Sequence, residues 1–209
     1  MNNTEKTVEE RILDAAYHTF VEKGYEGAKM RDIASRADIN ISMLHYYYRS
    51  KDNLFDIAFS RAFENVYGEI LKILSSRQMN IHDKIIAIVD QYISSLTENP
   101  LLPGFLIREI TKNDIKDKEA RQKFAPYREQ LFKAAAVLES QLKDEVSKGN
   151  IRSVNLMEFL MDIESVCMYP FLNRGLWQRV FDVPDEEFNQ KMRSRKETFI
   201  NNILKSLEK

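Results

Sequence analysis

Cysteine is nearly absent from this sequence of 209 residues, since Cys167 is its only one. A single cysteine cannot close a disulfide within the chain, and no group of cysteines and histidines has the spacing of a metal site. We therefore expect no metal and no cofactor. A reducing cytoplasm is the expected location.

Long apolar runs are also missing, and no stretch approaches the ~18 uninterrupted apolar residues of a membrane helix. The first residues, MNNTEKTVEER, are polar and charged, and no apolar segment of a secretion signal follows them. The sequence therefore predicts a protein that is neither exported nor embedded in a membrane.

Motifs of the common catalytic sites are absent as well. There is no Glu-x-x-His pair for a di-iron bundle, no Asp-Asp-x-x-Asp run for magnesium, no glycine-rich phosphate loop and no Gly-x-Ser-x-Gly turn. The sequence therefore gives an enzyme no residues on which to build its chemistry, and we expect no catalytic residues.

Glycine and proline are sparse, with six and five residues, and most of them lie between strongly periodic segments. No segment alternates apolar and polar residues long enough to indicate a strand. We expect an all-α fold of about nine helices. Residues 1–52 should form a three-helix helix-turn-helix domain, and residues 53–209 a helical domain for ligand binding and dimerisation, so that the boundary lies near the start of a long helix.

Particular segments support this division. Thr7 and Glu10 form a capping box at the first helix, which Gly24 ends. Two short helices, at about 29–36 and 40–46, follow around a break at 37–39, where Asp38 can adopt a left-handed conformation. Further expectations are one long helix from Ser50 through residue 74, a loop at 100–104, an irregular stretch at 170–184 and a last helix at 185–207.

Charge is distributed unevenly, although the chain as a whole carries only −1. Between residues 27 and 51, five basic residues stand against two acidic ones, which gives a local net charge of +3. The basic residues are Lys29, Arg31, Arg36, Arg49 and Lys51, and the acidic ones are Asp32 and Asp38. A local basic island on one face indicates salt-sensitive attraction to nucleic-acid phosphates.

Residues 28–51 offer the parts that a reader of DNA sequence needs: a short helix for the major groove, a second helix that supports it, and donors for phosphates. Leu44 is expected to face the core, which directs its neighbours outward. The candidate DNA-binding residues are Lys29, Arg31, Asn40, Ile41, Ser42, Met43, His45, Tyr46, Tyr47 and Lys51.

The segments FVEKGY (20–25), MRDIA (30–34) and LHYYYRSKDNL (44–54) resemble the pattern of the TetR family of bacterial regulators. That pattern is a helix with Asp-Ile-Ala, a string of Leu, Tyr and aromatic residues, and a Lys-(Asp/Glu)-x-Leu start of the next helix. The resemblance covers about the first 60 residues. The remainder agrees only in the number and order of helices.

The resemblance implies a role for each matching position. Arg31 would reach DNA from the supporting helix, residues 40–43 would face base edges, His45 and Tyr47 would touch the backbone, and Lys51 would bind phosphate. His45 stands where the family usually has tyrosine. Tyr48 stands where it has phenylalanine, and its hydroxyl needs a partner if it is buried.

The same resemblance implies a homodimer that binds a palindromic operator in double-stranded DNA, represses transcription and is released by a small-molecule effector. The aromatic and methionine-rich second domain would suit a lipophilic effector. Candidate pocket residues are Phe63, Tyr67, Tyr92, Phe105, Phe124, Tyr127, Cys167 and Trp177. Candidate dimer-interface residues are Leu156, Phe159, Leu160, Ile163, Phe188, Met192, Phe199 and Ile203.

Several of these residues also have a purely structural explanation. A tyrosine-rich helix end is often a packed corner, scattered aromatics are ordinary core material, and Cys167 can simply pack as a small apolar residue. Glu164 and Arg108 could pair with each other or with a polar ligand group. The whole chain could also be an all-helical dimeric protein-interaction module, for which binding to duplex DNA would not depend on salt.

Overall fold

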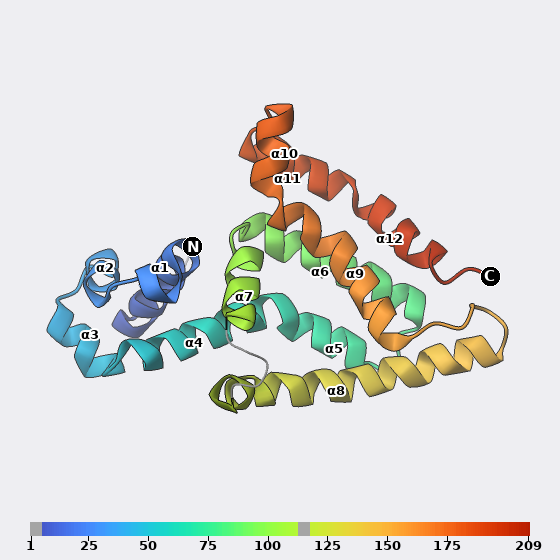
Figure 1. Ribbon diagram of the computed structural model, residues 1–209, viewed down its shortest axis with the longest axis horizontal. Coiled ribbons are helices and arrows are strands. Elements are labelled where there is room, and N and C mark those ends of the chain that lie inside the picture. The colour runs from blue at the N-terminus through green and yellow to red at the C-terminus, as the bar shows by residue number, and fades with distance from the viewer. Residues whose placement is uncertain (1–5, 113–117) are drawn as a thin grey trace. The chain divides into compact units, whose positions relative to one another are not determined.

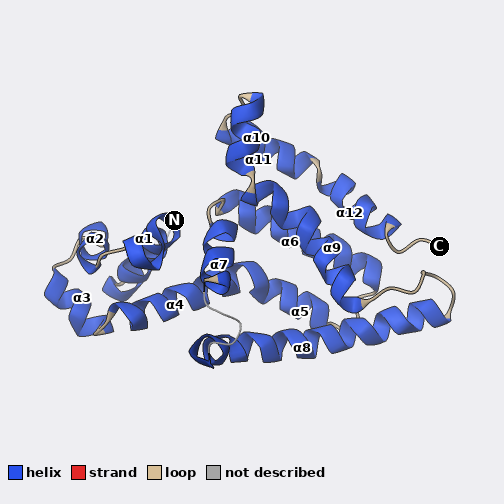
Figure 2. Cartoon of the chain, in the orientation of Figure 1, coloured by secondary structure: helices blue, strands red, loops and turns tan. Residues whose placement is uncertain are grey.

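The structure is a computed structural model that describes residues 6–112 and 118–209, without the side chains of 118–124 and 126. Within these ranges, the ordered elements are helices connected by turns and loops, with no strand (Figure 2). The predicted all-α class is confirmed. None of the helices in the described part of the chain is long and apolar enough to cross a membrane.

The helices are labelled in chain order in Figure 1. Their bounds are α1 Val8–Gly27, α2 Met30–Arg36, α3 Ile41–Tyr48, α4 Lys51–Phe63, the π-helical turn η1 Glu64–Gly68, α5 Glu69–Ser75, α6 Ile81–Glu98, α7 Leu102–Thr111, α8 Lys118–Ser147, α9 Leu156–Leu172, α10 Arg174–Phe181, α11 Asp185–Ser194 and α12 Lys196–Lys205.

The chain divides into two compact units. Unit 1 comprises residues 1–64 and 104–112, and unit 2 comprises residues 65–103 and 113–209. The chain first passes from unit 1 to unit 2 between residues 64 and 65, within η1. The domain boundary expected from the sequence, after residue 52, lies earlier, at the start of α4.

Unit 1 is held together by apolar residues of α1 to α4. Ile12 and Phe20 from α1, Ile33 from α2, Leu44 from α3 and Leu54 from α4 are all fully buried. α1 packs on α2 and α4, and α3 packs on both α2 and α4. Because α2 and α3 are only two turns long, this shared core determines their orientation.

Unit 2 is built around α6, which contacts α5, α8, α9, α11 and α12. Ile85, Ile88, Val89, Ile93 and Leu96 form its buried stripe at helical spacing. Since one helix touches five others, α6 is the central element of this unit.

Several helix boundaries differ from the expectations. The expected loop at 100–104 is wrong in its second half, since α7 begins at Leu102 and Pro103 occupies its first turn. Proline is tolerated there because the first amides of a helix lack acceptors within that helix. Pro170 likewise lies inside α9 rather than ending it, and helical structure follows directly at α10.

The last expected helix, 185–207, is two helices that meet at Arg195. The expected irregular stretch at 170–184 contains α10, an amphipathic helix of two turns. Asp182, in the left-handed conformation with φ of 51°, ends α10. The number of helices therefore exceeds the expected nine, because broken helices and short ones leave weak periodicity in a sequence.

Candidate nucleic-acid interface

The turn between α2 and α3 depends on two polar residues. Asp38 adopts the left-handed conformation with φ of 54°, as the sequence predicted. Asn40 caps α3, and its Oδ1 accepts a hydrogen bond of 2.7 Å from the Met43 amide. These local contacts join α2 and α3 in the tight arrangement of a helix-turn-helix.

Helix α3 has one buried and one exposed face. Leu44 and Tyr48 are buried against the rest of unit 1, as expected for Leu44. Ser42, Met43 and Tyr46 are exposed, and Tyr46 leaves 82% of its surface free. The side chains that sequence analysis assigned to base contact therefore lie on the outward side of a short helix, with Ile41 and Asn40 at its start; Ile41 is half-buried.

The start of α4 carries the cation assigned to phosphate. The Ser50 Oγ accepts a hydrogen bond of 3.1 Å from the Asn53 amide and so caps the helix. Lys51 is the first residue of α4, and its Nζ lies 4.3 Å from the ring centroid of Tyr25. The Tyr25 hydroxyl in turn donates to Asp52, which raises the pKa of Tyr25 to about 12. Lys51 thus lies at the positive end of α4, where anions bind favourably.

The cations near α2 and α3 fall into two groups. Lys23 pairs with Asp32 at 2.6 Å, and Arg36 forms a two-bond pair with Glu22 at 2.7 and 2.9 Å. The other four cations of residues 27–51 form no ion pair with any described residue: Lys29, Arg31, Arg49 and Lys51.

We call these four the free cations. The expected basic island is therefore present but contains fewer unpaired charges, because Arg36 pairs with Glu22 and Asp32 pairs with Lys23. Its net charge is unchanged, since one cation and one acid are removed together.

The two positions that depart from the family pattern behave differently. The Nδ1 of His45 lies 3.4 Å from the Arg49 carbonyl oxygen, and the ring is exposed. The Tyr48 hydroxyl is buried and has no hydrogen-bond partner among the described residues. Burial, together with the charge of Glu9, raises the pKa of Tyr48 to about 12. Tyr48 is therefore a core residue, whereas Tyr46 and Tyr47 are surface residues in edge contact at 5.6 Å.

The arrangement has the chemistry of a DNA-reading surface. Polar and apolar side chains on the outer face of α3 can contact base edges, and the free cations can contact phosphates on either side. Groups of three or more metal-ligating side chains are not found in the part of the chain that the structure describes.

The candidate pocket residues do not form one group. Phe105 is buried in unit 1, where its ring lies 6.1 Å from that of Phe55. Trp177 stands on α10 and stacks on Phe181 at 6.3 Å. Phe63 ends α4, Tyr127 is half-buried on α8, and the Phe124 side chain lies outside the described residues.

Three candidates meet in unit 2. Tyr67 and Tyr92 pack edge to face at 6.4 Å, and the Tyr92 hydroxyl donates a hydrogen bond of 2.8 Å to Glu164. Burial raises the pKa of Glu164, and burial with the nearby Glu164 charge raises the pKa of the Cys167 thiol to about 12. We call Tyr67, Tyr92, Glu164 and Cys167 the tyrosine–carboxylate cluster. The Arg108–Glu164 pairing left open by the sequence does not occur, because Arg108 pairs with Glu109.

The candidate interface residues face mostly inward. Six of them are buried within the protomer, and only Leu156 and Leu160 are half-buried: the six are Phe159, Ile163, Phe188, Met192, Phe199 and Ile203. The exposed apolar residues of α9 are their neighbours Met157, Met161, Tyr169 and Leu172. Sequence reasoning missed these because α9 is apolar on both faces, so that periodicity does not indicate which face is outside.

Comparison with known proteins places this site in a family. Residues 12–57 match the model of the bacterial regulatory proteins of the tetR family. Over 189 residues the chain is 22% identical to the probable HTH-type transcriptional regulator YttP of Bacillus subtilis (strain 168), covering 89% of this chain and 88% of that protein. It is 25% identical over 152 residues to the HTH-type transcriptional repressor KstR of Rhodococcus jostii (strain RHA1), covering 73% and 70%.

The fold has a solved counterpart as well. The crystal structure of HlyIIR, a hemolysin II transcriptional regulator, matches with a TM-score of 0.64 and 22% identity over 97% of each chain. The family match lies on the helix-turn-helix of unit 1, and the fold likeness extends over both units' helices. The helix-turn-helix of residues 12–57 therefore belongs to the tetR family of bacterial regulatory proteins, and the chain as a whole shares the fold of HlyIIR.

Proposed function

We propose that this regulator is a repressor that binds a palindromic operator as a homodimer and is released by a small lipophilic effector. The observation that carries the proposal is the outer face of α3, whose exposed side chains are flanked by the free cations. KstR, a relative over most of this chain, is named as a repressor, which supports the direction of regulation.

Dimeric binding follows from the size of the reading element. Helix α3 has eight residues, so one copy can read only a few base pairs in a major groove. A second copy related by a two-fold axis adds an inverted half-site about one helical turn away. Because the free cations are few, affinity should depend on the spacing of two readers more than on bulk charge.

The tyrosine–carboxylate cluster supports a binding site for the effector. Its aromatic rings offer apolar contact, and its carboxyl and hydroxyl groups offer hydrogen bonds for a polar end. Tyr67 belongs to η1, which continues directly from α4 along the chain. A ligand that favours one geometry of η1 would change the spacing of the two readers, whereas a ligand with no preference would change nothing.

Selection from random duplexes tests the proposal. The purified chain should enrich an inverted repeat whose half-site centres lie about 34 Å apart along the helix axis, or a multiple of that distance. Enrichment of a single half-site would contradict dimeric binding. Absence of any enrichment, with binding that does not change with salt, would favour the protein-interaction module instead.

A further inference from the structure

Two acidic residues lie near Lys51, the free cation at the start of α4. Asp52 follows it directly in the chain. Glu26, at the end of α1, has its pKa lowered by a hydrogen bond from Lys112 and, more weakly, by the charge of Lys51. Attraction between opposite charges would favour an ion pair between Lys51 and either acid. Neither pair forms, because both acids are bonded to other donors.

Asp52 is bonded to the Tyr25 hydroxyl, which donates to its carboxylate. This bond joins the end of α1 to the start of α4 across 27 residues of sequence, and a hydrogen bond to a carboxylate is a strong one. The ring of the same tyrosine faces the Lys51 ammonium, whose Nζ lies 4.3 Å from the ring centroid. Tyr25 therefore holds the acid with its hydroxyl and contacts the cation with its ring.

Glu26 is bonded to a second lysine. The Lys112 Nζ lies 2.8 Å from the Glu26 Oε1 and 5.3 Å from the Tyr25 ring centroid. Lys112 directly follows α7, and residues 104–112 belong to unit 1 together with α1 to α4. The end of α7 therefore supplies a cation to the end of α1, although the two segments are far apart in the sequence.

The charges around Tyr25 balance, but their bonding does not. Lys51 and Lys112 stand against Glu26 and Asp52, so these four side chains have no net charge. Both acids accept a hydrogen bond, and Lys112 donates one of them. Only Lys51 has no acidic partner, so its ammonium donors are available to an oxygen of another molecule.

We propose that Tyr25 and Lys112 are positioning residues, which hold Asp52 and Glu26 away from Lys51 and so keep its ammonium free for a DNA phosphate. This inference rests on the proposed binding of duplex DNA and names residues on which the phosphate contact depends. An ion pair within the protein would have to break before Lys51 could bind a phosphate, which would weaken the binding of DNA.

Tyr25→Phe tests the hydroxyl and keeps the ring. Because it frees Asp52 to pair with Lys51, binding to a mixed-sequence duplex of about 30 base pairs at low salt should weaken about three- to tenfold. Asp52→Asn should strengthen binding more in this variant than in the wild type. Tyr17→Phe removes the hydroxyl of another half-buried tyrosine of α1 and is the matched control, which should bind as the wild type does.

Lys112→Ala makes the corresponding test at Glu26. The freed carboxylate should pair with Lys51, and binding to the same duplex should weaken by a similar factor. Glu26→Gln should then strengthen binding more in this variant than in the wild type. Lys133→Ala is the matched control, because it also removes an exposed lysine from an ion pair, with Glu129 of α8.

The Lys51→Ala background separates positioning from other roles. Neither Tyr25→Phe nor Lys112→Ala should weaken binding further there, since the ammonium that they keep free is gone. Equal losses with and without Lys51 would overturn the proposal, and so would binding at the wild-type level by both single variants. If the wild type binds no duplex at low salt, the proposed function fails as well.

The added neutral substitutions also distinguish the proposal from a purely structural role. Tyr25 packs against Phe55 at 5.0 Å between ring centroids, so its loss could weaken the fold of unit 1. Damage to the fold would not be reversed by Asp52→Asn. Failure of both neutral substitutions to restore binding would therefore contradict the proposal.

Discussion

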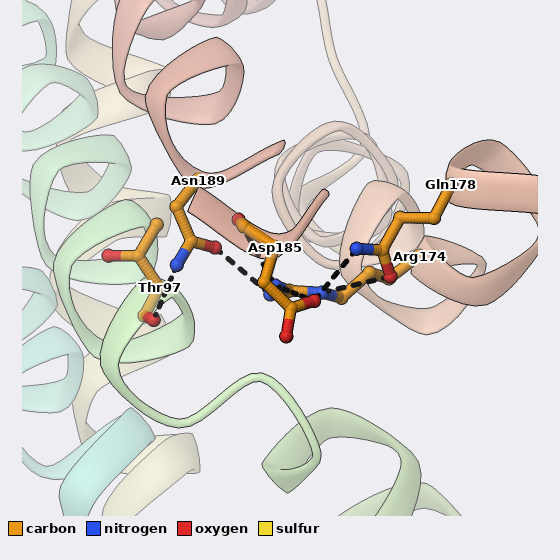
Figure 3. A network of polar contacts seen from close by, with 5 residues as sticks. All are labelled: Thr97, Arg174, Gln178, Asp185 and Asn189. Carbon is orange, nitrogen blue, oxygen red and sulfur yellow. Dashed lines mark hydrogen bonds and ion pairs between the residues drawn. The ribbon is translucent and has the colours of Figure 1, made fainter. Parts of the chain in front are cut away.

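Three cations near α3 in unit 1 are exposed and form no ion pair, whereas two cations of unit 2, Lys84 and Arg174, are buried and hydrogen-bonded. Lys29, Arg31 and Arg49 face solvent. Lys84 is 1% exposed and donates to the Leu74 carbonyl at 2.6 Å, and Arg174 is held by the network of Figure 3. An exposed free cation is available to a phosphate, while a buried one fixes the position of an element.

Exposed aromatic residues follow the same division. Tyr46 and Tyr47 lie among the free cations, whereas Trp177 and Phe181 line a groove of unit 2 together with Glu187, Lys191 and Arg195. The same type of side chain therefore stands in two different surroundings. The predictions below change one side of this comparison at a time.

The largest expected effect is on Arg174. Arg174→Ala removes a buried guanidinium together with its hydrogen bonds to Asp185 and Asn189. We expect a loss of about 2–4 kcal/mol in the free energy of unfolding, measured with urea. Arg179→Ala, on the exposed side of α10, is the control and should change stability by less than about 0.5 kcal/mol. Equal stability of the two variants would contradict the role of the network.

A smaller effect is expected at Glu164. Burial raises its pKa in the folded chain above the unfolded value, so folding takes up a proton between the two. Its contribution to stability is thus full below the unfolded pKa and is lost as pH rises through the folded pKa. Glu164→Gln keeps an acceptor for Tyr92 and does not titrate.

Thermal unfolding as a function of pH measures this difference. Glu164→Gln should be more stable than the wild type at pH 8 and nearly equal to it at pH 4. Glu158→Gln, at an exposed position of the same helix, should follow the wild type throughout. A wild type that gains stability from pH 4 to pH 8 relative to Glu164→Gln would reverse the sign and refute the argument.

The smallest expected effect separates two roles of Asn40, which caps α3 and also offers an amide to a base. Asn40→Ala should lose the cap and about 1 kcal/mol of stability, whereas Asn40→Ser should retain the cap. Both should alter base preference in duplex selection, as should Ser42→Ala, which leaves the cap intact. An unaltered preference in Asn40→Ser would show that the amide reads no base.

Helix caps, turns and buried positions of unit 1 could be predicted from the sequence because each depends on a few neighbouring residues. Examples are the capping box of Thr7 and Glu10, the left-handed Asp38 and the inward Leu44. The candidate DNA-binding residues follow from the same segment, and most of them are exposed in the structure.

Features of unit 2 depend on contacts between distant segments and could not be predicted. Helix α10 is held by Arg174 and Asp185, eleven residues apart, and through Asn189 to Thr97. Both faces of α9 are apolar, so the sequence alone does not distinguish buried Phe159 and Ile163 from exposed Met157. The candidate pocket residues fall in two different units for the same reason, since contacts between distant segments decide which of them meet.

The salt dependence of operator binding tests the central claim most directly, since that claim is that the free cations of unit 1 bind DNA phosphates. The slope of log K against log salt should be negative for the wild type, and Arg31→Ala with Lys51→Ala should reduce its magnitude by about 2. Lys143→Ala, an exposed lysine of unit 2, should leave the slope unchanged. A wild-type slope near zero, or an unchanged slope in the double variant, would contradict the account.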